Sequence, residues 1–303
     1  MMKKRTLGST LLQISELGLG CMSLGTDENE AIQTIHTAID AGINYIDTAD
    51  LYDFGRNEEI VGKALKDRRD QVVLATKVGN RWNQSKDTWS WDPSKKHIQE
   101  GVKESLLRLN TDYIDLYQLH GGTFEDHYEE TIEAFDELVK EGCIRYYGIS
   151  SIRPNVIQRF SKHSSIQSVM MQYNVLERRP EEFFSQLEKQ SISIIVRGAV
   201  AKGLLTNNWQ NKIKSSGYMS YSEHELIETI NQLTQLLDQD QTLHSLALHY
   251  LLQNNAVSSL AVGARNQKQL SENISAYFSK PLSNQQLTFI KEHTHAETYS
   301  DHR

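Results

Sequence analysis

The sequence is short of several features that mark particular classes of protein. Cysteine occurs only at Cys21 and Cys143, far apart and without CxxC spacing, so we expect no disulfide framework. No apolar run approaches the ~18 residues of a membrane span. The basic N-terminus, MMKKRTLGST, lacks the apolar segment of a secretory signal. These absences predict a cytoplasmic protein in a reducing compartment, with no membrane association.

An excess of positive charge is also missing. The chain has 32 Lys and Arg against 39 Asp and Glu, a net charge of −7, so we expect no nucleic-acid partner. Proline occurs 4 times, and no Pro/Gly/Ser-rich linker or break in composition divides the 303 residues. We therefore expect one domain over residues 1–303, long enough to bury a large core. The sequence leaves the oligomeric state open.

What the sequence does contain is a recurring order of a short apolar strand and then a helix. The predicted strands are 17–19, 43–46, 71–76, 113–119, 144–149, 168–172, 192–196 and 257–262. The predicted helices are 28–41, 58–65, 93–109, 132–141, 154–161, 180–190, 223–237, 243–253, 267–276 and 284–293. Eight such units predict an α/β fold, a (β/α)8 TIM barrel with its site at the C-terminal rim of the strands. The alternative is an open doubly wound sheet, and the lack of a GxGxxG motif after the first strand weighs against it.

Ionisable side chains follow three successive predicted strands. Asp47 and Tyr52 come after the second strand, Lys77 ends the third and His120 ends the fourth. In a barrel these ends are neighbours on one rim, so we expect the four groups to converge. A phenol has an unperturbed pKa near 10, and a nearby ammonium held by a carboxylate favours its ionised form. These four residues predict a site in which the phenol delivers a proton to a carbonyl oxygen and the imidazole orients that carbonyl group.

The motifs around these residues resemble those of the aldo-keto reductase superfamily. They are DTADLY followed by NEEIVGKAL, then ATKVG, RLNTDYIDLYQLH and GISS, in this order. The resemblance covers nearly the whole chain and implies a (β/α)8 barrel that reduces aldehydes and ketones with NADPH and without a metal. By position, Tyr52 is similar to the general acid and Lys77 to the ammonium that strengthens it. Asp47 is similar to the partner of Lys77, and His120 to the group that orients the carbonyl.

The same resemblance implies the residues that bind NADPH/NADP. The nicotinamide half would contact Ser150, Ser151, Gln172 and Arg197. The loop over the pyrophosphate would contain Gly198, Val200, Gly203 and Leu204. The adenosine 2′-phosphate and the adenine would meet Gly263, Ala264, Arg265, Gln269, Glu272 and Asn273. The site at Arg265 is also sensible on physical grounds, because an arginine and the amides at a helix N-terminus both attract phosphate.

The loops of the expected substrate rim depart from the common family pattern. Gly121 and Gly122 follow the fourth strand where many relatives have a bulky residue and then Pro-Asp, which predicts a more open or more mobile rim. Trp82, Trp89 and Trp91 lie in the polar loop after the third strand. Two interpretations of these tryptophans stay open: a wall of the substrate pocket, or packing of the loop on itself. The identity of the small-molecule carbonyl substrate is therefore not fixed by the sequence.

Two other functions stay open beside carbonyl reduction. Lys77 at a barrel strand end suits a Schiff-base lyase, but the nearby Asp47 would keep the lysine charged and weighs against it. Some members of the family are regulatory partners of channels, which suggests a non-catalytic nicotinamide-binding barrel; the presence of all four catalytic residues weighs against that. The sequence favours an NADPH-dependent oxidoreductase that reduces aldehydes or ketones to alcohols, with Tyr52 as the proton donor.

Overall fold

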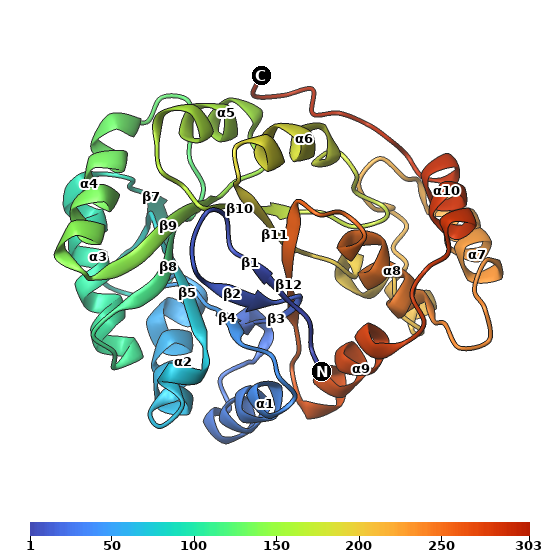
Figure 1. Cartoon of the computed structure of the whole chain (residues 1–303), viewed down its shortest axis with the longest axis horizontal. Helices are drawn as coiled ribbons and strands as arrows, with labels where there is room; N and C mark the ends of the chain where they lie inside the picture. The colour runs from blue at the N-terminus through green and yellow to red at the C-terminus, as the bar shows by residue number, and fades with distance from the viewer.

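The computed structural model describes residues 1–303, and at its centre eight parallel strands close into a barrel (Figure 1). In order around the barrel they are β3 (Leu17–Gly20), β4 (Tyr45–Asp47), β5 (Val73–Val78), β8 (Ile114–Leu119), β9 (Ile144–Ser150), β10 (Ser168–Gln172), β11 (Ser193–Arg197) and β12 (Val257–Gly263). Pairing of β12 with β3 closes the ring. The predicted (β/α)8 barrel is confirmed, and the open doubly wound sheet is excluded.

Helices surround the barrel, as Figure 1 shows. They are α1 (Glu28–Asp40), α2 (Arg56–Leu65), α3 (Lys95–Leu109), α4 (Tyr128–Glu141), α5 (Pro154–His163), α6 (Glu181–Lys189), α7 (Glu223–Gln235), α8 (Leu243–Leu252), α9 (Gln267–Phe278) and α10 (Asn284–His293). Side-chain caps mark several helix starts, for example Asp27, which accepts a hydrogen bond from the Glu30 amide at 3.0 Å. Among them, α3 packs on β5, α4 on β9, α6 on β11 and α8 on β12. No helix has the length and apolar character that crossing a bilayer requires.

A hairpin that the sequence analysis did not identify covers the N-terminal end of the barrel. It consists of β1 (Lys4–Thr6) and β2 (Gln13–Ser15), which pair antiparallel. Leu7 and Ile14 of this segment join a small apolar cluster with inward-facing residues of six barrel strands, and Figure 1 shows the hairpin lying across the centre of the barrel. Because this end is plugged by side chains, the opposite rim is the one that is left to hold a ligand.

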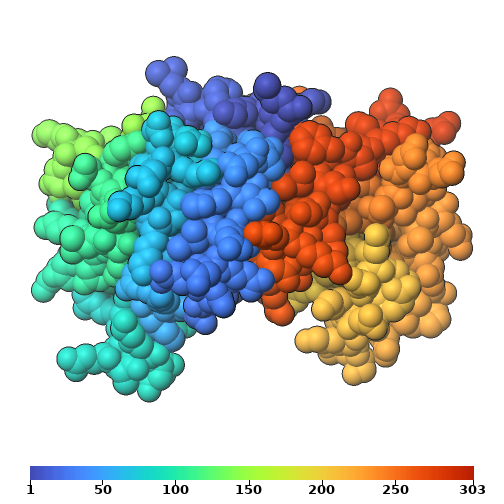
Figure 2. All heavy atoms as spheres, turned by 90° about the horizontal axis from the view of Figure 1, so that it is seen from below, coloured from blue at the N-terminus to red at the C-terminus, as the bar shows by residue number.

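A second hairpin corrects the prediction of a polar loop after β5. Strands β6 (Asn80–Trp82) and β7 (Trp89–Trp91) pair antiparallel. The indole Nε1 of Trp91 donates to Asp126 at 2.9 Å, and its ring covers Gly79, where a Cβ atom would lie 2.7 Å from it. Figure 2 shows projecting lobes on the side opposite the N-terminal hairpin, in the colours of this segment and of residues near 200–220. The lobes flank the rim where the strands end.

Candidate active site

Lys77 lies at the centre of the rim and is fully buried. Its Nζ donates to Asp47 Oδ1 at 2.6 Å, to the carbonyl oxygen of Thr48 at 2.7 Å and to Tyr52 Oη at 3.2 Å. An ammonium has three N–H donors, so all of them are used. The predicted contact between the end of β5 and the loop after β4 is therefore present, and Lys77 is held in one position as a cation.

Asp47 is also fixed by neighbours that the sequence analysis missed. Its Oδ2 lies within 3.4 Å of the hydroxyl of Tyr45 and accepts from Gln118 Nε2 at 3.3 Å. Burial raises the pKa of the Asp47 carboxyl, and Lys77 opposes this rise. Burial alone would lower the pKa of Lys77, but Asp47 and Tyr52 outweigh burial and raise it. The polar Gln118, one residue before the end of the buried strand β8, was the sequence signal that could have revealed this support.

The backbone after β4 explains why Tyr52 reaches the lysine. The amide of Thr48 donates to the carbonyl of Ala75 at 2.9 Å, which keeps the chain beside β5 beyond the strand end. The chain then reverses through a short 3-10 segment, Tyr52–Gly55, in which Asp53 and Phe54 both have φ of 49°. Such left-handed conformations are uncommon for residues other than glycine and collect at functional sites. The turn directs the phenol into the rim while α2 begins.

His120 completes the group of four. Its ring lies 5.9 Å from that of Tyr52, edge to face, and its backbone amide donates to the carbonyl of Val78 at 2.7 Å. Burial, and then the positive charges of Lys77 and Arg197, lower the pKa of His120 to about 3. The imidazole is therefore neutral near pH 7, and its buried Nδ1 has no partner within the chain. A neutral imidazole can donate one N–H to a carbonyl oxygen.

These side chains border a cavity of about 670 Å³. Tyr52 and His120 line it, and Trp89 and Trp91 of the second hairpin form part of its wall. Trp82 does not line this cavity and packs edge to face on Phe54 instead, with ring centroids 6.3 Å apart. Trp89 and Trp91 therefore agree with the interpretation of a pocket wall, whereas Trp82 packs against the segment that follows β4. Gly121 and Gly122 also line the cavity, but they do not leave open space, because a Cβ atom there would lie 3.1 Å from the Trp91 ring and 2.8 Å from Val156, respectively.

The residues expected around the nicotinamide lie at three neighbouring strand ends. Ser150 and Ser151 end β9 and border the same cavity, while Gln172 ends β10 and Arg197 ends β11. Arg197 donates to Gln172 Oε1 at 3.0 Å. The structure thus brings these four residues onto the rim beside Tyr52 and His120, as the sequence analysis expected.

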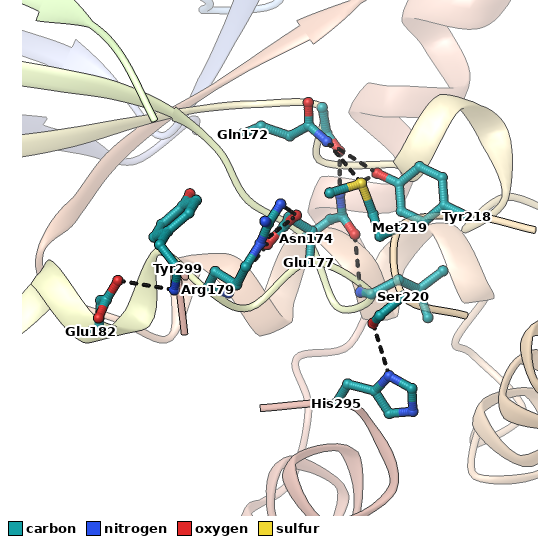
Figure 3. A network of polar contacts seen from close by, with 12 residues as sticks. Gln172, Asn174, Glu177, Arg179, Glu182, Tyr218, Met219, Ser220, His295 and Tyr299 are labelled. Carbon is teal, nitrogen blue, oxygen red and sulfur yellow. Dashed lines mark hydrogen bonds and ion pairs between the residues drawn. The ribbon is translucent and has the colours of Figure 1, made fainter. Parts of the chain in front are cut away.

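A segment that the sequence analysis treated only as a long polar stretch also reaches this place. The Nε2 of Gln172 contacts Tyr218 Oη at 3.5 Å and Met219 Sδ at 3.8 Å (Figure 3). Asn174 donates to the same Tyr218 oxygen at 3.0 Å. Nothing in the sequence pattern of residues 207–221 reveals these contacts, because they depend on a chain reversal between Tyr218 and Tyr221.

The four residues expected over the pyrophosphate are of two kinds: two glycines with positive φ and two apolar residues that pack in the core. Gly198 and Gly203 have φ of 72° and 94°, which glycine adopts without steric cost. The side chain of Leu204 belongs to the main apolar core, and that of Val200 packs against it. These two residues can therefore present only backbone groups to a ligand. Val200 and Leu204 therefore hold the loop in place through packing of their side chains.

The residues expected at the adenosine end surround the start of α9. The amide of Arg265 donates to Gln269 Oε1 at 2.9 Å, and Asn273 Nδ2 donates to the carbonyl of Gly263 at 3.2 Å. Ala264 is buried, whereas Arg265 and Glu272 are exposed. Neither Arg265 nor Arg197 forms an ion pair with an acidic residue; Arg197 donates to Gln172, and the exposed guanidinium of Arg265 is free to meet phosphate. Together with amide and hydroxyl groups at the ends of β9 and β10, this donor set fits a nicotinamide dinucleotide.

Comparison with known proteins agrees with this arrangement. The sequence profile described as "Aldo/keto reductase family" matches residues 16–295. The chain belongs to the aldo-keto reductase family. Aldo-keto reductases are oxidoreductases that act on carbonyl compounds with nicotinamide cofactors, commonly NADPH.

Three similar proteins illustrate the range of the family. The "Uncharacterized oxidoreductase YqkF" of Bacillus subtilis is 52% identical, with all of both chains covered. The holo form of "aldo-keto reductase AKR11C1" from Bacillus halodurans has a TM-score of 0.95 and 52% identity, again over all of both chains. The "NADH-specific methylglyoxal reductase" of Escherichia coli is 30% identical over 96% of this chain and 98% of the relative.

The environment of Lys77 on this rim tests the alternative function, a lyase that forms a Schiff base. A Schiff-base lysine attacks as a neutral amine and needs a free approach to its nitrogen. Lys77 is fully buried, its three donors are occupied, and its pKa is raised. This geometry suits a fixed cation that acts on Tyr52, and it argues against a nucleophile.

Proposed function

We propose that this aldo-keto reductase reduces aldehydes or ketones to alcohols with NADPH, and that Tyr52 donates the proton. The observation that carries the proposal is the buried chain of contacts from Asp47 through Lys77 to Tyr52, with distances of 2.6 Å and 3.2 Å. Because the Tyr52 oxygen accepts a hydrogen bond from Lys77, its own hydrogen is free to turn toward a ligand in the cavity. Such positioned proton transfer accelerates reactions by roughly 10²–10⁴-fold.

Each of the four residues then has a distinct task. When bound, the reduced nicotinamide supplies a hydride to the carbonyl carbon. Tyr52 protonates the carbonyl oxygen as negative charge develops on it, and Lys77 stabilises the phenolate that remains. Asp47 keeps Lys77 charged and in place. The neutral His120 donates an N–H to the same oxygen and so orients the substrate.

The cofactor assignment follows the chain around the rim. Ser150, Ser151 and Gln172 would hold the carboxamide of the nicotinamide, with Arg197 against the ring. Arg265 would bind the 2′-phosphate that distinguishes NADPH from NADH, since a guanidinium is well suited to phosphate. The Escherichia coli relative is described as NADH-specific, so the preference of this chain needs a direct measurement.

The test is a fluorescence titration with NADPH and NADH, followed by rates with a reactive aldehyde. Loss of a charge-assisted hydrogen bond in Arg265→Ala should raise the Kd for NADPH by about 10- to 100-fold and leave that for NADH nearly unchanged. Lys291→Ala, which removes an exposed cation on α10, is the matched control. Tyr52→Phe should lower kcat by about 10²–10⁴-fold with an unchanged Kd for NADPH.

Two results would contradict the proposal. A wild-type protein that binds neither nicotinamide nucleotide would remove the cofactor assignment entirely. Binding with a rate that does not depend on Tyr52 would retain the cofactor and discard the proposed proton donor.

A further inference from the structure

Most arginines of this chain have an acidic partner, and the exceptions are informative. The sequence contains fourteen arginines, and ten of them lie within 4.0 Å of a carboxylate. The four without one are Arg153, Arg159, Arg197 and Arg265. Arg265 lies where the proposed cofactor would bring its 2′-phosphate, and Arg197 lies where it would bring its nicotinamide ring. Arg159 is half-buried: it lies over two aromatic rings, 4.3 Å and 4.6 Å from their centroids, and donates to the carbonyl of Phe124 at 2.8 Å. Arg153 has no such aromatic contact and remains to be explained.

Arg153 lines the catalytic cavity. Its Nη1 donates to the carbonyl of Gly122 at 2.7 Å, and its backbone amide donates to Ser151 Oγ at 3.3 Å. The residue is thus held between the loop that follows His120 and the end of β9. A guanidinium has five N–H donors, and only one of them has a partner within the chain. The remaining donors have no acceptor from the protein.

The charges around Arg153 favour an anion. Among the residues that line the cavity, Asp53 is the one acid, against the two cations Arg153 and Arg197. His120 adds no positive charge, because its lowered pKa of about 3 leaves it neutral. A second cavity of about 470 Å³ shares Thr123 and Arg153 with the first, and it is also lined by one acid, Glu125, and one further cation, Arg303. Arg153 therefore stands where a ligand in the catalytic cavity can extend outward.

The N-terminus of α5, which begins after Arg153, offers no free backbone amide to an anion. The amide of Asn155 at the start of α5 donates to the carbonyl of His302 at 2.8 Å, and that of Ile157 donates to the carbonyl of Arg153 at 3.0 Å. These amides are not available to a ligand. The guanidinium of Arg153 is the group at this place that can bind an anion directly.

We propose that Arg153 recognises an anionic group on the substrate, so that this reductase prefers aldehydes carrying a carboxylate or a phosphate away from the carbonyl. The inference rests on the proposed function and names the substrate class of the same site. Arginine binds both anions through paired N–H donors, and Trp89, Trp91 and Leu51 offer apolar surface to the intervening carbons. The carbonyl carbon gains a hydride from the reduced nicotinamide and its oxygen gains a proton from Tyr52. The product is the corresponding hydroxy acid or phosphorylated alcohol, and the anionic group itself is unchanged.

The experiment compares matched pairs of substrates with NADPH. One pair is succinic semialdehyde and butanal, and the other is glyceraldehyde 3-phosphate and glyceraldehyde. The wild type should favour the anionic member of at least one pair by tenfold or more in kcat/KM, and the favoured pair tells carboxylate from phosphate. Arg153→Met keeps the apolar stem and removes the charge, so this ratio should fall at least tenfold. Arg153→Lys should restore part of the ratio, and Arg159→Met, the matched control, should leave it as in the wild type.

The outcomes separate this inference from the proposed function. A wild type that reduces butanal and glyceraldehyde as well as their anionic partners refutes the role of Arg153 and leaves carbonyl reduction intact. An Arg153→Met variant that loses activity equally on both members of a pair, or that binds NADPH more weakly, shows a structural or cofactor role and also overturns it. A wild type that reduces none of the four aldehydes with NADPH refutes the proposed function and this inference together.

Discussion

The sharpest stability prediction concerns Lys77→Met. In the wild type the lysine is 0% exposed, Asp47 is 3% exposed, and 2.6 Å separates their charged atoms. Methionine fills similar space without a charge, so Asp47 remains buried with no cation beside it. Removing one partner of a buried ion pair costs about 3–5 kcal/mol. At about 2 °C per kcal/mol for a large domain, we expect Tm to fall by roughly 6–10 °C.

The same substitution should make stability depend on pH in a defined direction. Burial raises the pKa of Asp47, and Lys77 is the main group that opposes this rise. In Lys77→Met the hydrogen bonds from Tyr45 and Gln118 still oppose burial, but the larger effect of the cation is gone, so the folded pKa lies further above the unfolded value of about 3.9. The folded state then binds more protons than the unfolded state. The free energy of unfolding of the variant should therefore rise as pH falls through the raised pKa, and be lowest at alkaline pH.

Urea denaturation at several pH values, with calorimetry beside it, tests both parts. The double variant Asp47→Asn/Lys77→Met carries no buried charge at the pair and should recover at least half of the lost stability. Lys103→Met, an exposed cation on α3, should stay within about 0.5 kcal/mol of the wild type. The reasoning is refuted if Lys77→Met costs less than about 1 kcal/mol, or if its pH dependence matches that of the wild type.

Three further predictions concern separate parts of the molecule. Because the pKa of His120 is about 3, its C–H resonances should not titrate between pH 5 and 8; a midpoint inside that range would contradict the neutral imidazole. Arg108→Ala leaves the fully buried Glu58, 2.7 Å away in the wild type, without its cation, so urea denaturation should show a loss of about 3–5 kcal/mol, and a loss below 1 kcal/mol would count against a buried pair. Tyr218→Phe removes a hydroxyl contact of Gln172 and should weaken NADPH binding by about 2- to 10-fold; an unchanged Kd would show that the contact does not position Gln172.

The sequence was sufficient for the barrel and for the meeting of four side chains on its rim. Apolar strands and helices alternate eight times, and the four polar residues in question come at the ends of three successive strands. Once parallel order is assumed, Asp47, Lys77 and His120 must be neighbours, because β4, β5 and β8 are adjacent in the ring. This inference needs only the period of the pattern and the rule that the ends of parallel strands share one edge.

The features that escaped prediction depend on contacts between distant segments. The two hairpins have strands of three residues each, too short for an alternating pattern to stand out. The support of Asp47 by Gln118 joins residues 71 positions apart, and the contact of Gln172 with Tyr218 joins residues 46 apart. Such pairs are set by how loops fold over the finished barrel. Propensity and period describe the local chain and carry no information about them.

The cations on the rim differ in whether the protein provides them with an acidic partner, and this difference suggests two different roles. Lys77 is buried and fully bonded, which keeps its charge constant and directs its effect to Tyr52. Arg153, Arg197 and Arg265 lie around the same rim without an acidic partner, and two of them border the catalytic cavity. A cation that the fold leaves unpaired beside a cavity is stabilised when an anion arrives, because the guanidinium then gains the charge-assisted hydrogen bonds that the protein does not supply. In the function that we propose, the paired lysine therefore serves the chemistry, and the unpaired arginines serve the recognition of cofactor and substrate.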